Sequence, residues 1–382
     1  MKLLFITHSS NLVYGAARSL NLLLKNAPFH YDIVFSKQFL RYHSSDEVKG
    51  YVGPNCDNIF YCDLLLDYSM MQSFSSWDKD KSFLNNLKEI GSKYKKAILY
   101  CIHKQELYRI IENGNYDFIH LNSSVLYPIL NSKYNMVIHI RELLPSKIPF
   151  YAKLKFSKAK SVICIEEPVK RHFMIACSEK GIDRTNVLLN PFDMRSVKKI
   201  DLQSALREYA LDANTIVFTI AGVVSHSKGV DFVIDSFLSN TLENKVLLVV
   251  GNDTTPAAVE FKKKYASQLS VRFLGEIKNM DPIYAITDYI VRGEPEFCTG
   301  RTVYEALFSG CSVLIPGSEQ NIHDGGFLPD QQNRVHFYEP LNAVALGKQF
   351  LKLGKPTKSN YVESNIDDYV KNFVSILERN MS

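Results

Sequence analysis

Short apolar runs alternate with helical patterns from one end of the chain to the other, and this alternation restricts the fold more than any other feature. The runs are rich in Val, Ile, Leu and Phe and lack the polar alternation of a half-exposed strand. Continuous apolar strands joined by helices are typical of a parallel sheet with helices on both faces. In the first half of the chain the pattern predicts strands at 2–7, 31–36, 97–101, 117–122, 136–141 and 161–166, with helices at 16–25, 80–92, 103–113 and 166–176.

A second series of the same kind begins after a polar, charged stretch that follows residue 193. It predicts strands at 215–222, 245–252, 271–275, 288–293 and 312–317, with helices at 228–239, 256–267, 280–287 and 302–310. A chain of 382 residues is also too long for one ordinary core. We therefore expect an α/β protein with two Rossmann-like domains, residues 1–192 and 193–364, and ligands at the carboxyl ends of the strands, in a cleft where the domains face each other.

The last segment, residues 365–382, carries a further helical pattern. Four apolar positions fall on one face of this helix, namely Ile366, Tyr369, Phe373 and Ile376. That face has to pack against another part of the protein, and one interpretation is that the helix returns to the first domain.

Composition and charge exclude several classes of protein. The net charge of +5 is compatible with a phosphate-bearing ligand or an anionic membrane surface, but it is far from the composition of a nucleic-acid-binding protein. The seven cysteines form no Cys-x-x-Cys pair, which favours reduced thiols in a cytoplasmic protein. No segment approaches the roughly 18 apolar residues of a membrane span, and residues 1–7 are interpreted as a buried strand rather than a signal peptide.

Four motifs in the second half follow one another in order: IAGVVSHSKGVDFVIDSF (220–237), VLLVVGND (246–253), VRFLGEIKNMDPIYAITDYIV (271–291) and EFCTGRTVYEALFSGCSVLIPGS (296–318). In sequence and spacing they resemble the retaining glycosyltransferases of family 4, which have the GT-B fold. The resemblance implies two Rossmann-like domains that face each other across a cleft. It also implies that the second domain binds a nucleotide-diphosphate sugar, linked to UDP or GDP, as a substrate, and that the protein needs no cofactor.

The helix that begins near residue 300 has the chemistry of an anion site, because the N–H groups and positive dipole end of a helix N-terminus suit a phosphate. Its opening residues are Gly300, Arg301 and Thr302. The resemblance implies that Glu305 accepts hydrogen bonds from the ribose hydroxyls, and that Lys228, six residues after Gly222, neutralises the departing diphosphate. The alternatives are a solvated helix glutamate and an ordinary lysine at a helix start.

Two departures from the family pattern concern this donor site. The family usually has an arginine directly after the first glycine, where this chain has Val223, and three other side chains are candidates for its role: Arg301, Arg292 and His226. The two family glutamates usually have seven residues between them, whereas Glu296 and Glu305 have eight, as if one residue near Cys298 were inserted. Glu296 is the candidate for contacting the donor sugar hydroxyls, with Glu294 as its substitute.

The first domain resembles the family more loosely. Residues 9–24 look like the family's glycine-containing loop, in which Gly15 would let the backbone approach a phosphate or sugar. Arg141 and Glu142 stand where the family often has a histidine and an acid near the reacting carbon. Arg141 is a candidate for contact with an anionic acceptor or the donor phosphate, and an ion pair within its own domain is the alternative. Further candidates at strand ends, with a core or hinge role as the alternative, are His120, Asn122, His139 and Asn190.

The segment 147–160 interleaves lysines with aromatic and apolar residues. One interpretation is an amphipathic surface that lies on anionic lipid, near a lipid-linked acceptor. The alternative, which is the more common one for such sequences, is an ordinary helix with a solvated basic face.

Together these features predict a glycosyltransferase that binds no metal, with protein groups and a helix dipole in place of a cation. The chain contains no Walker loop, dinucleotide-binding glycine motif, His-Glu-x-x-His or nucleophile elbow. We expect transfer of a sugar to a glycan or lipid-linked acceptor with retention of configuration, in bacterial surface polysaccharide synthesis. The expected location is the cytoplasm, including the inner face of the membrane. Two alternatives stay open: a GT-B-fold epimerase or hydrolase of nucleotide sugars, with His120 or Glu142 as acid or base, and a scaffold subunit without turnover.

Overall fold

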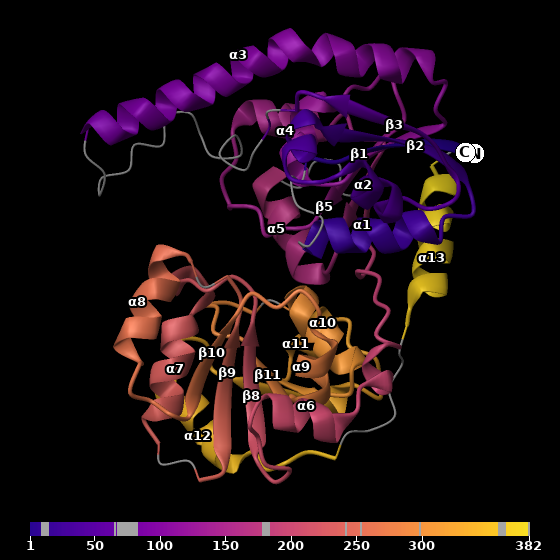
Figure 1. The fold of residues 1–382 in the computed structure, drawn as a ribbon. Coiled ribbons are helices and arrows are strands. Elements are labelled where there is room, and N and C mark those ends of the chain that lie inside the picture. Colours follow the sequence, from indigo (N-terminus) through magenta and orange to yellow (C-terminus); the bar gives the residue numbers. More distant parts are fainter. Residues whose placement is uncertain are drawn as a thin grey trace. The chain divides into compact units, whose positions relative to one another are not determined.

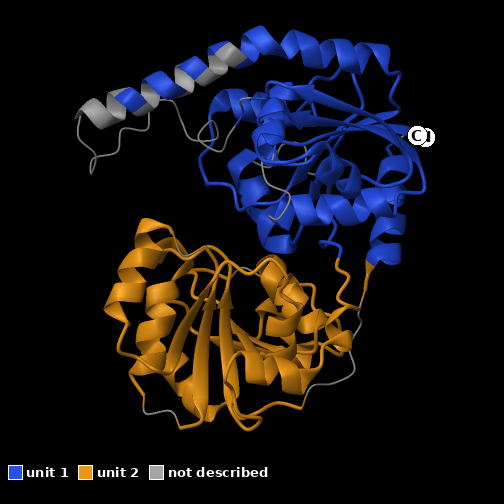
Figure 2. Cartoon of the chain, viewed as in Figure 1, with its two compact units in different colours: residues 1–191, 366–382 blue, residues 192–365 orange. Residues whose placement is uncertain are grey.

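Two parallel β-sheets, each with helices on both faces, form the described part of the protein (Figure 1). The computed structural model describes residues 1–8, 15–64, 66, 83–177, 184–240, 243–252, 254–297, 299–357 and 364–380. The chain divides into two compact units, which are residues 1–191 with 366–382 (unit 1) and residues 192–365 (unit 2) (Figure 2). The prediction of an α/β protein built on parallel sheets is confirmed.

The described part of unit 1 contains a sheet with the strand order β3-β2-β1-β4-β5-β6-β7. Its strands are β1 (Lys2–Ile6), β2 (His30–Ser36), β3 (Cys56–Cys62), β4 (Phe118–Leu121), β5 (Met136–Ile140), β6 (Ser161–Cys164) and β7 (Thr185–Val187). Its α-helices are α1 (Gly15–Lys25), α2 (Ser45–Tyr51), α3 (Phe83–Asn113), α4 (Phe150–Phe156), α5 (Glu167–Cys177) and α13 (Ile366–Glu378). Leu4 and Ile6 of β1 pack with α3, α4 and α5, whereas Leu3 and Phe5 pack with α1, α2 and α13, so both faces of the strand are buried.

The described part of unit 2 contains a sheet with the strand order β10-β9-β8-β11-β12-β13. Its strands are β8 (Ile216–Ala221), β9 (Lys245–Val250), β10 (Val271–Gly275), β11 (Tyr289–Val291), β12 (Ser312–Pro316) and β13 (Val335–Tyr338). Its helices are α6 (Leu202–Glu208), the short 3-10 helix η6 (His226–Lys228), α7 (Val230–Leu238), α8 (Pro256–Lys264), α9 (Asp281–Ile286), α10 (Gly300–Phe308), α11 (Asn321–Asp324) and α12 (Ala343–Lys352). The helices α7, α8 and α12 share one core with the sheet, and α6 and α9 share a core that includes Val217 of β8.

The strand order places a switch point at the centre of each sheet. In unit 2 the chain moves outward from β8 through β9 to β10, then returns to β11 on the other side of β8 and moves outward again. The loops that leave the carboxyl ends of β8 and β11 therefore diverge, and ligands of open parallel sheets bind where such loops diverge. In unit 1 the corresponding point lies between β1 and β4.

One predicted strand is wrong, because residues 97–101 belong to the 31-residue helix α3. Tyr100, Leu107 and Ile111 are buried, and their spacing is helical. A short apolar run cannot by itself be assigned to a strand or to a helix. Residues 80–82 of the predicted helix 80–92 lie outside the described residues. Within the part of the chain that the structure describes, no helix, α3 included, is long and apolar enough to cross a bilayer.

The C-terminal helix α13 completes the core of unit 1. All four predicted apolar positions are buried, namely Ile366, Tyr369, Phe373 and Ile376. The ring of Phe373 stacks on that of Phe5 in β1, with the ring centroids 6.3 Å apart. The chain enters and leaves unit 2 at adjacent points, because the Asn365 N–H donates to the Phe192 carbonyl and the Phe192 N–H donates to Asn365 Oδ1.

Two histidines, His120 of β4 and His139 of β5, are fully buried in unit 1. His120 Nε2 lies 3.3 Å from His139 Nδ1, and the His120 ring packs against Phe5 and Phe373. Burial, and then the charge of Arg141, lowers the pKa of His120 to about 3 and lowers that of His139 well below its usual value. Both imidazoles are therefore neutral at neutral pH.

The neutral state of His120 predicts a loss of stability in mild acid. Because the pKa of His120 is lower in the folded than in the unfolded protein, the unfolded state gains the proton first, and stability is lost as the pH falls below about 6.5. Between pH 6.5 and pH 5, the unfolding free energy of the wild type should fall by about 2 kcal/mol more than that of His120→Phe. Urea unfolding, followed by hydrogen exchange of unit 1 amides at both pH values, measures this difference. An unchanged pH dependence in the variant would show that the folded protein tolerates a protonated His120.

Candidate functional site

Two glycines allow the loops after β8 and β11 to touch. Gly229 has a φ of 62°, and a Cβ atom there would lie 1.9 Å from the carbonyl oxygen of Gly293. A Cβ atom on Gly293 would in turn lie 2.3 Å from the Gly229 oxygen. Any side chain at either position would force the loops apart. The contact brings Lys228, which precedes the first glycine, to Glu294, which follows the second.

Lys228, Arg292 and Glu294 form a charged cluster at the switch point of unit 2. Lys228 Nζ donates to Glu294 Oε1 over 3.3 Å, and Arg292 donates to both carboxylate oxygens, with its Nε 2.9 Å from Oε2. The carboxylate is nearly buried, but the lysine side chain is 46% exposed. Burial raises the pKa of Glu294, but the charge and hydrogen bonds of Arg292, together with the charge of Lys228, outweigh it, so the pKa is lowered. Two cations against one carboxylate leave one positive charge in excess.

Arg292 also supports the start of α10. Its Nη1 donates to Thr302 Oγ1 over 2.7 Å, and a Cβ atom on Gly300, whose φ is 61°, would lie 3.0 Å from the same nitrogen. Thr299 precedes the helix, but its side chain does not cap it, and its hydroxyl instead donates to Tyr304. The guanidinium of Arg292 thus lies at the positive end of the helix dipole. This is the chemistry of an anion site.

Glu305, one turn further along α10, is buried and has partners on both carboxylate oxygens. Arg301 Nε donates to Oε1 over 2.7 Å, and Tyr284 Oη donates to Oε2 over 2.7 Å. The side chain of Glu305 is 2% exposed and that of Arg301 is 11% exposed. The Arg301 guanidinium also lies over the Phe192 ring, 4.9 Å from its centroid. Arg301, a candidate for phosphate binding, is thus held in an ion pair inside unit 2.

The other donor-site candidates lie around the same loops. The side chains of Glu296 and Val223 are exposed. Gly222 follows β8 with a φ of 136°, and its carbonyl oxygen lies 1.8 Å from where a Cβ atom on Gly251 would be. Cys298, the proposed site of the extra residue, lies outside the described residues. His226 Nδ1 donates to the Asp231 carboxylate over 2.7 Å, and this hydrogen bond raises the pKa of His226.

Arg141 lies at the end of β5 with its guanidinium bonded inside unit 1. Nε and Nη2 donate to Asn122 Oδ1 over 3.1 and 2.9 Å, and Nη1 donates to Asn190 Oδ1 over 2.8 Å. The pKa of Arg141 is lowered by burial. The guanidinium also lies 3.3 Å from His139 Nδ1, whereas Glu142 accepts from the Arg141 backbone N–H over 3.0 Å. Arg141 thus ties together the ends of β4 and β5 and the segment after β7.

Glu142 and Gly15 occupy different surroundings in unit 1. Glu142 accepts hydrogen bonds from the hydroxyls of Ser123 and Ser124, and burial raises its pKa above the usual value. Gly15 is the first residue of α1, and the loop before it, residues 9–14, lies outside the described residues.

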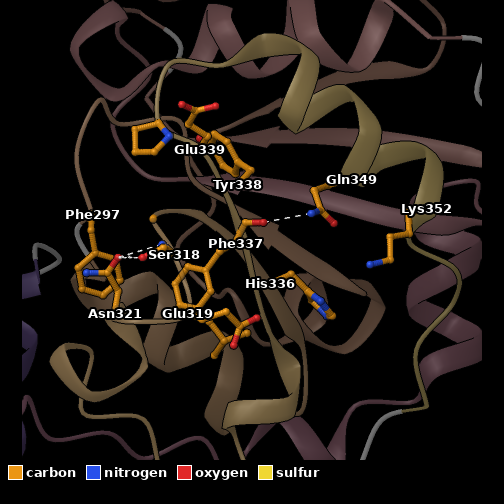
Figure 3. A pocket seen from close by; sticks show the side chains of 13 residues that line it. Phe297, Ser318, Glu319, Asn321, His336, Phe337, Tyr338, Glu339, Gln349 and Lys352 are labelled. Carbon is orange, nitrogen blue, oxygen red and sulfur yellow. Dashed lines mark hydrogen bonds between the residues drawn. The ribbon is translucent and has the colours of Figure 1, made fainter.

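A separate pocket of about 660 Å³ lies beside β13, at the edge of the unit 2 sheet (Figure 3). Phe297 and Phe337 line it with ring centroids 6.3 Å apart, together with the carboxylates of Glu319 and Glu339. Gln349 Nε2 donates to the Phe337 carbonyl over 3.1 Å and so covers part of the strand edge. Neither Lys228 nor any other residue of the charged cluster lines this pocket.

The prediction that no metal is bound stays a prediction. Among the described residues, no group of three His, Cys, Asp or Glu side chains is placed to hold a metal ion. The sequence also contains an Asp-x-Asp motif, a pattern that can bind a metal ion, at Asp78 and Asp80, which lie outside those residues.

Comparisons with solved structures identify the type of fold. No protein-family model matches the chain, and no curated protein matches it either. Among solved structures, Anabaena HepE in complex with UDP-glucose is similar, with a TM-score of 0.65, 15% identity, and coverage of 100% of this chain and 98% of that one. A glycosyltransferase from Rickettsia africae has a TM-score of 0.62, 17% identity and coverage of 100% and 96%. Sucrose-phosphate synthase from Thermosynechococcus elongatus has a TM-score of 0.61, 15% identity and coverage of 99% and 96%. The fold is therefore that of the GT-B glycosyltransferases.

The pair formed by Arg301 and Glu305 predicts a large stability effect. Glu305→Ala leaves the nearly buried arginine without its carboxylate, and such a loss costs about 3–5 kcal/mol. The double variant Arg301→Met, Glu305→Leu removes both charges and should cost clearly less. Urea unfolding of unit 2 distinguishes the two variants. A single variant as stable as the wild type would mean that Arg301 is readily solvated.

Proposed function

We propose that this protein is a glycosyltransferase that takes a sugar from a UDP- or GDP-linked donor, and that unit 2 binds the donor. The observation that carries the proposal is the charged cluster at the switch point, where an α10 N-terminus, Arg292 and the half-exposed Lys228 meet. A diphosphate fits this combination of fixed dipole and mobile cation. The fold adds support, because HepE, which has the same fold, was crystallised with UDP-glucose.

In the proposed mechanism Lys228 is the group that moves to the diphosphate. Negative charge grows on the leaving phosphate as the glycosidic bond breaks, and a nearby ammonium group stabilises it. Lys228 can reach a ligand because it is exposed, whereas Arg292 is held by Glu294 and Thr302. Glu294 thus acts as a positioning residue for both cations.

Glu296 is the proposed contact for the donor sugar hydroxyls, because its side chain is exposed on the loop that leads into α10. Glu305 is the proposed partner of the ribose hydroxyls. To accept those hydrogen bonds it has to share its oxygens with Arg301 and Tyr284. Retention of configuration, with the leaving phosphate helping to deprotonate the acceptor, completes the proposal and requires no side-chain base.

The acceptor is proposed to be a glycan or a lipid-linked oligosaccharide, and the setting to be surface polysaccharide synthesis on the cytoplasmic side of a bacterial membrane. Both rest on the resemblance of the sequence motifs. The acceptor would bind unit 1.

The described geometry gives little support to a nucleotide-sugar epimerase or hydrolase. His120 is fully buried and packs against two phenylalanines, and its low pKa makes it a poor proton carrier at neutral pH. Glu142 is bonded to two serine hydroxyls. A scaffold without turnover stays the main alternative, because Val223 stands where the family has an arginine.

Lys228→Ala tests the donor site. Losing one charge-assisted contact to phosphate should weaken UDP or GDP binding about 10- to 100-fold. Thermal stabilisation by a panel of nucleotides and nucleotide sugars measures the binding, and release of UDP or GDP from the donor measures turnover. Lys263→Ala, which removes an exposed lysine of α8, is the matched control and should bind like the wild type.

The outcomes separate the hypotheses. Stabilisation by no nucleotide, or equal stabilisation of the wild type and Lys228→Ala, would refute the donor site. Donor binding without release of nucleotide in the presence of candidate acceptors would favour the scaffold.

A further inference from the structure

The short helix α4 in unit 1 presents large apolar side chains to solvent. Phe150 is 73% exposed, Tyr151 is 54% exposed and Leu154 is 47% exposed. Only Ala152 and Phe156 of this helix are fully buried. A surface helix normally buries its apolar residues, and a contiguous exposed apolar patch marks an interaction site.

The long helix α3 presents further apolar side chains to solvent. Both helices contribute to the same core on one face of the unit 1 sheet. Tyr100 of α3 and Ala152 and Phe156 of α4 are buried in this core, so the two helices cover the same face of the sheet. Ile98 and Ile102, within one turn of Cys101, are 59% and 60% exposed. We call Phe150, Tyr151, Leu154, Ile98 and Ile102 the α4 surface.

Lysines are frequent in the segment that contains α4. The segment 147–160 contains five lysines and no carboxylate. Burial, and then the charges of Lys158 and Lys104, lowers the pKa of Lys155. Glu106 and Glu112, the acidic residues of α3 that follow Ile102, pair with lysines elsewhere. Glu106 pairs with Lys37 and Glu112 pairs with Lys133.

We propose that the α4 surface binds the surface of an anionic lipid bilayer. Apolar and aromatic side chains would enter the boundary between headgroups and acyl chains, while the lysines contact lipid phosphates. The composition argues against a protein partner, because protein interfaces are depleted in lysine. Lysine at the rim of an apolar surface suits a bilayer, since its long stem lies along the apolar layer and its ammonium stays in water.

This inference goes beyond the proposed function and is independent of the nucleotide site. It assigns unit 1 a membrane-facing side, on which a lipid-linked molecule would be within reach. A protein that fails to bind nucleotides can still bind vesicles, so the two proposals fail separately.

Flotation of the full-length protein with vesicles tests the proposal. The vesicles contain either phosphatidylcholine alone or phosphatidylcholine with about 30% phosphatidylglycerol, a content that gives a strongly negative surface. We expect binding to the anionic vesicles only, and a marked loss of binding when NaCl rises from about 0.1 M to about 1 M. Lys147→Gln with Lys158→Gln should weaken binding about fivefold for each lysine removed. Phe150→Ser with Leu154→Ser should weaken it by at least about tenfold.

Leu202→Ser with Val259→Ser is the matched control, because these unit 2 residues are 44% and 57% exposed. It should leave vesicle binding unchanged, and so should Lys228→Ala. Circular dichroism and thermal melting establish that each variant is folded. Absence of binding, equal binding to both kinds of vesicle, or equal losses in the α4 and control variants would overturn the proposal.

Discussion

The beginning of α10 depends on the arginine–carboxylate pairs that surround it. Glu294 fixes Arg292, which in turn donates to Thr302 in the first turn of the helix. Glu305, one turn further along the helix, fixes Arg301. Each pair is largely withdrawn from water, so removing one partner is much costlier than removing both. The carboxylates thus hold cations at a helix end where the dipole is already positive, an arrangement that is unfavourable by itself and that the proposed phosphate would stabilise.

Sequence patterns predicted most of the central strands because those strands are buried on both faces. Phe218 and Leu247, for example, lie in continuous apolar runs. The strands that the patterns missed, β3, β7 and β13, are at sheet edges, where one side meets solvent and polar residues interrupt the run. The five-residue run 97–101 suits a strand or a helix equally well, and it is helical because α3 is continuous with the segment that contains Leu107 and Ile111.

The candidate site was predicted less completely than the fold. The motif order identified Lys228, Glu305 and the start of α10, because these residues follow directly from the linear pattern. Their partners come from distant parts of the sequence and leave no local signal: Tyr284 approaches Glu305 from α9, and the contact of Gly229 with Gly293 joins loops far apart in sequence. Arg141 shows the same limit, since its acceptors Asn122 and Asn190 follow different strands.

The position of α13 has a consequence for how the protein is made. Phe373 and its neighbours in α13 fill the core beside β1, although the whole of unit 2 lies between β1 and α13 in the chain. Domains usually fold in order as the ribosome releases them. Here unit 1 cannot close its core until α13 has emerged, so Phe5 and the surrounding apolar side chains stay without their final cover while unit 2 is synthesised. Unit 2, whose strands and helices are contiguous in sequence, is free to finish first.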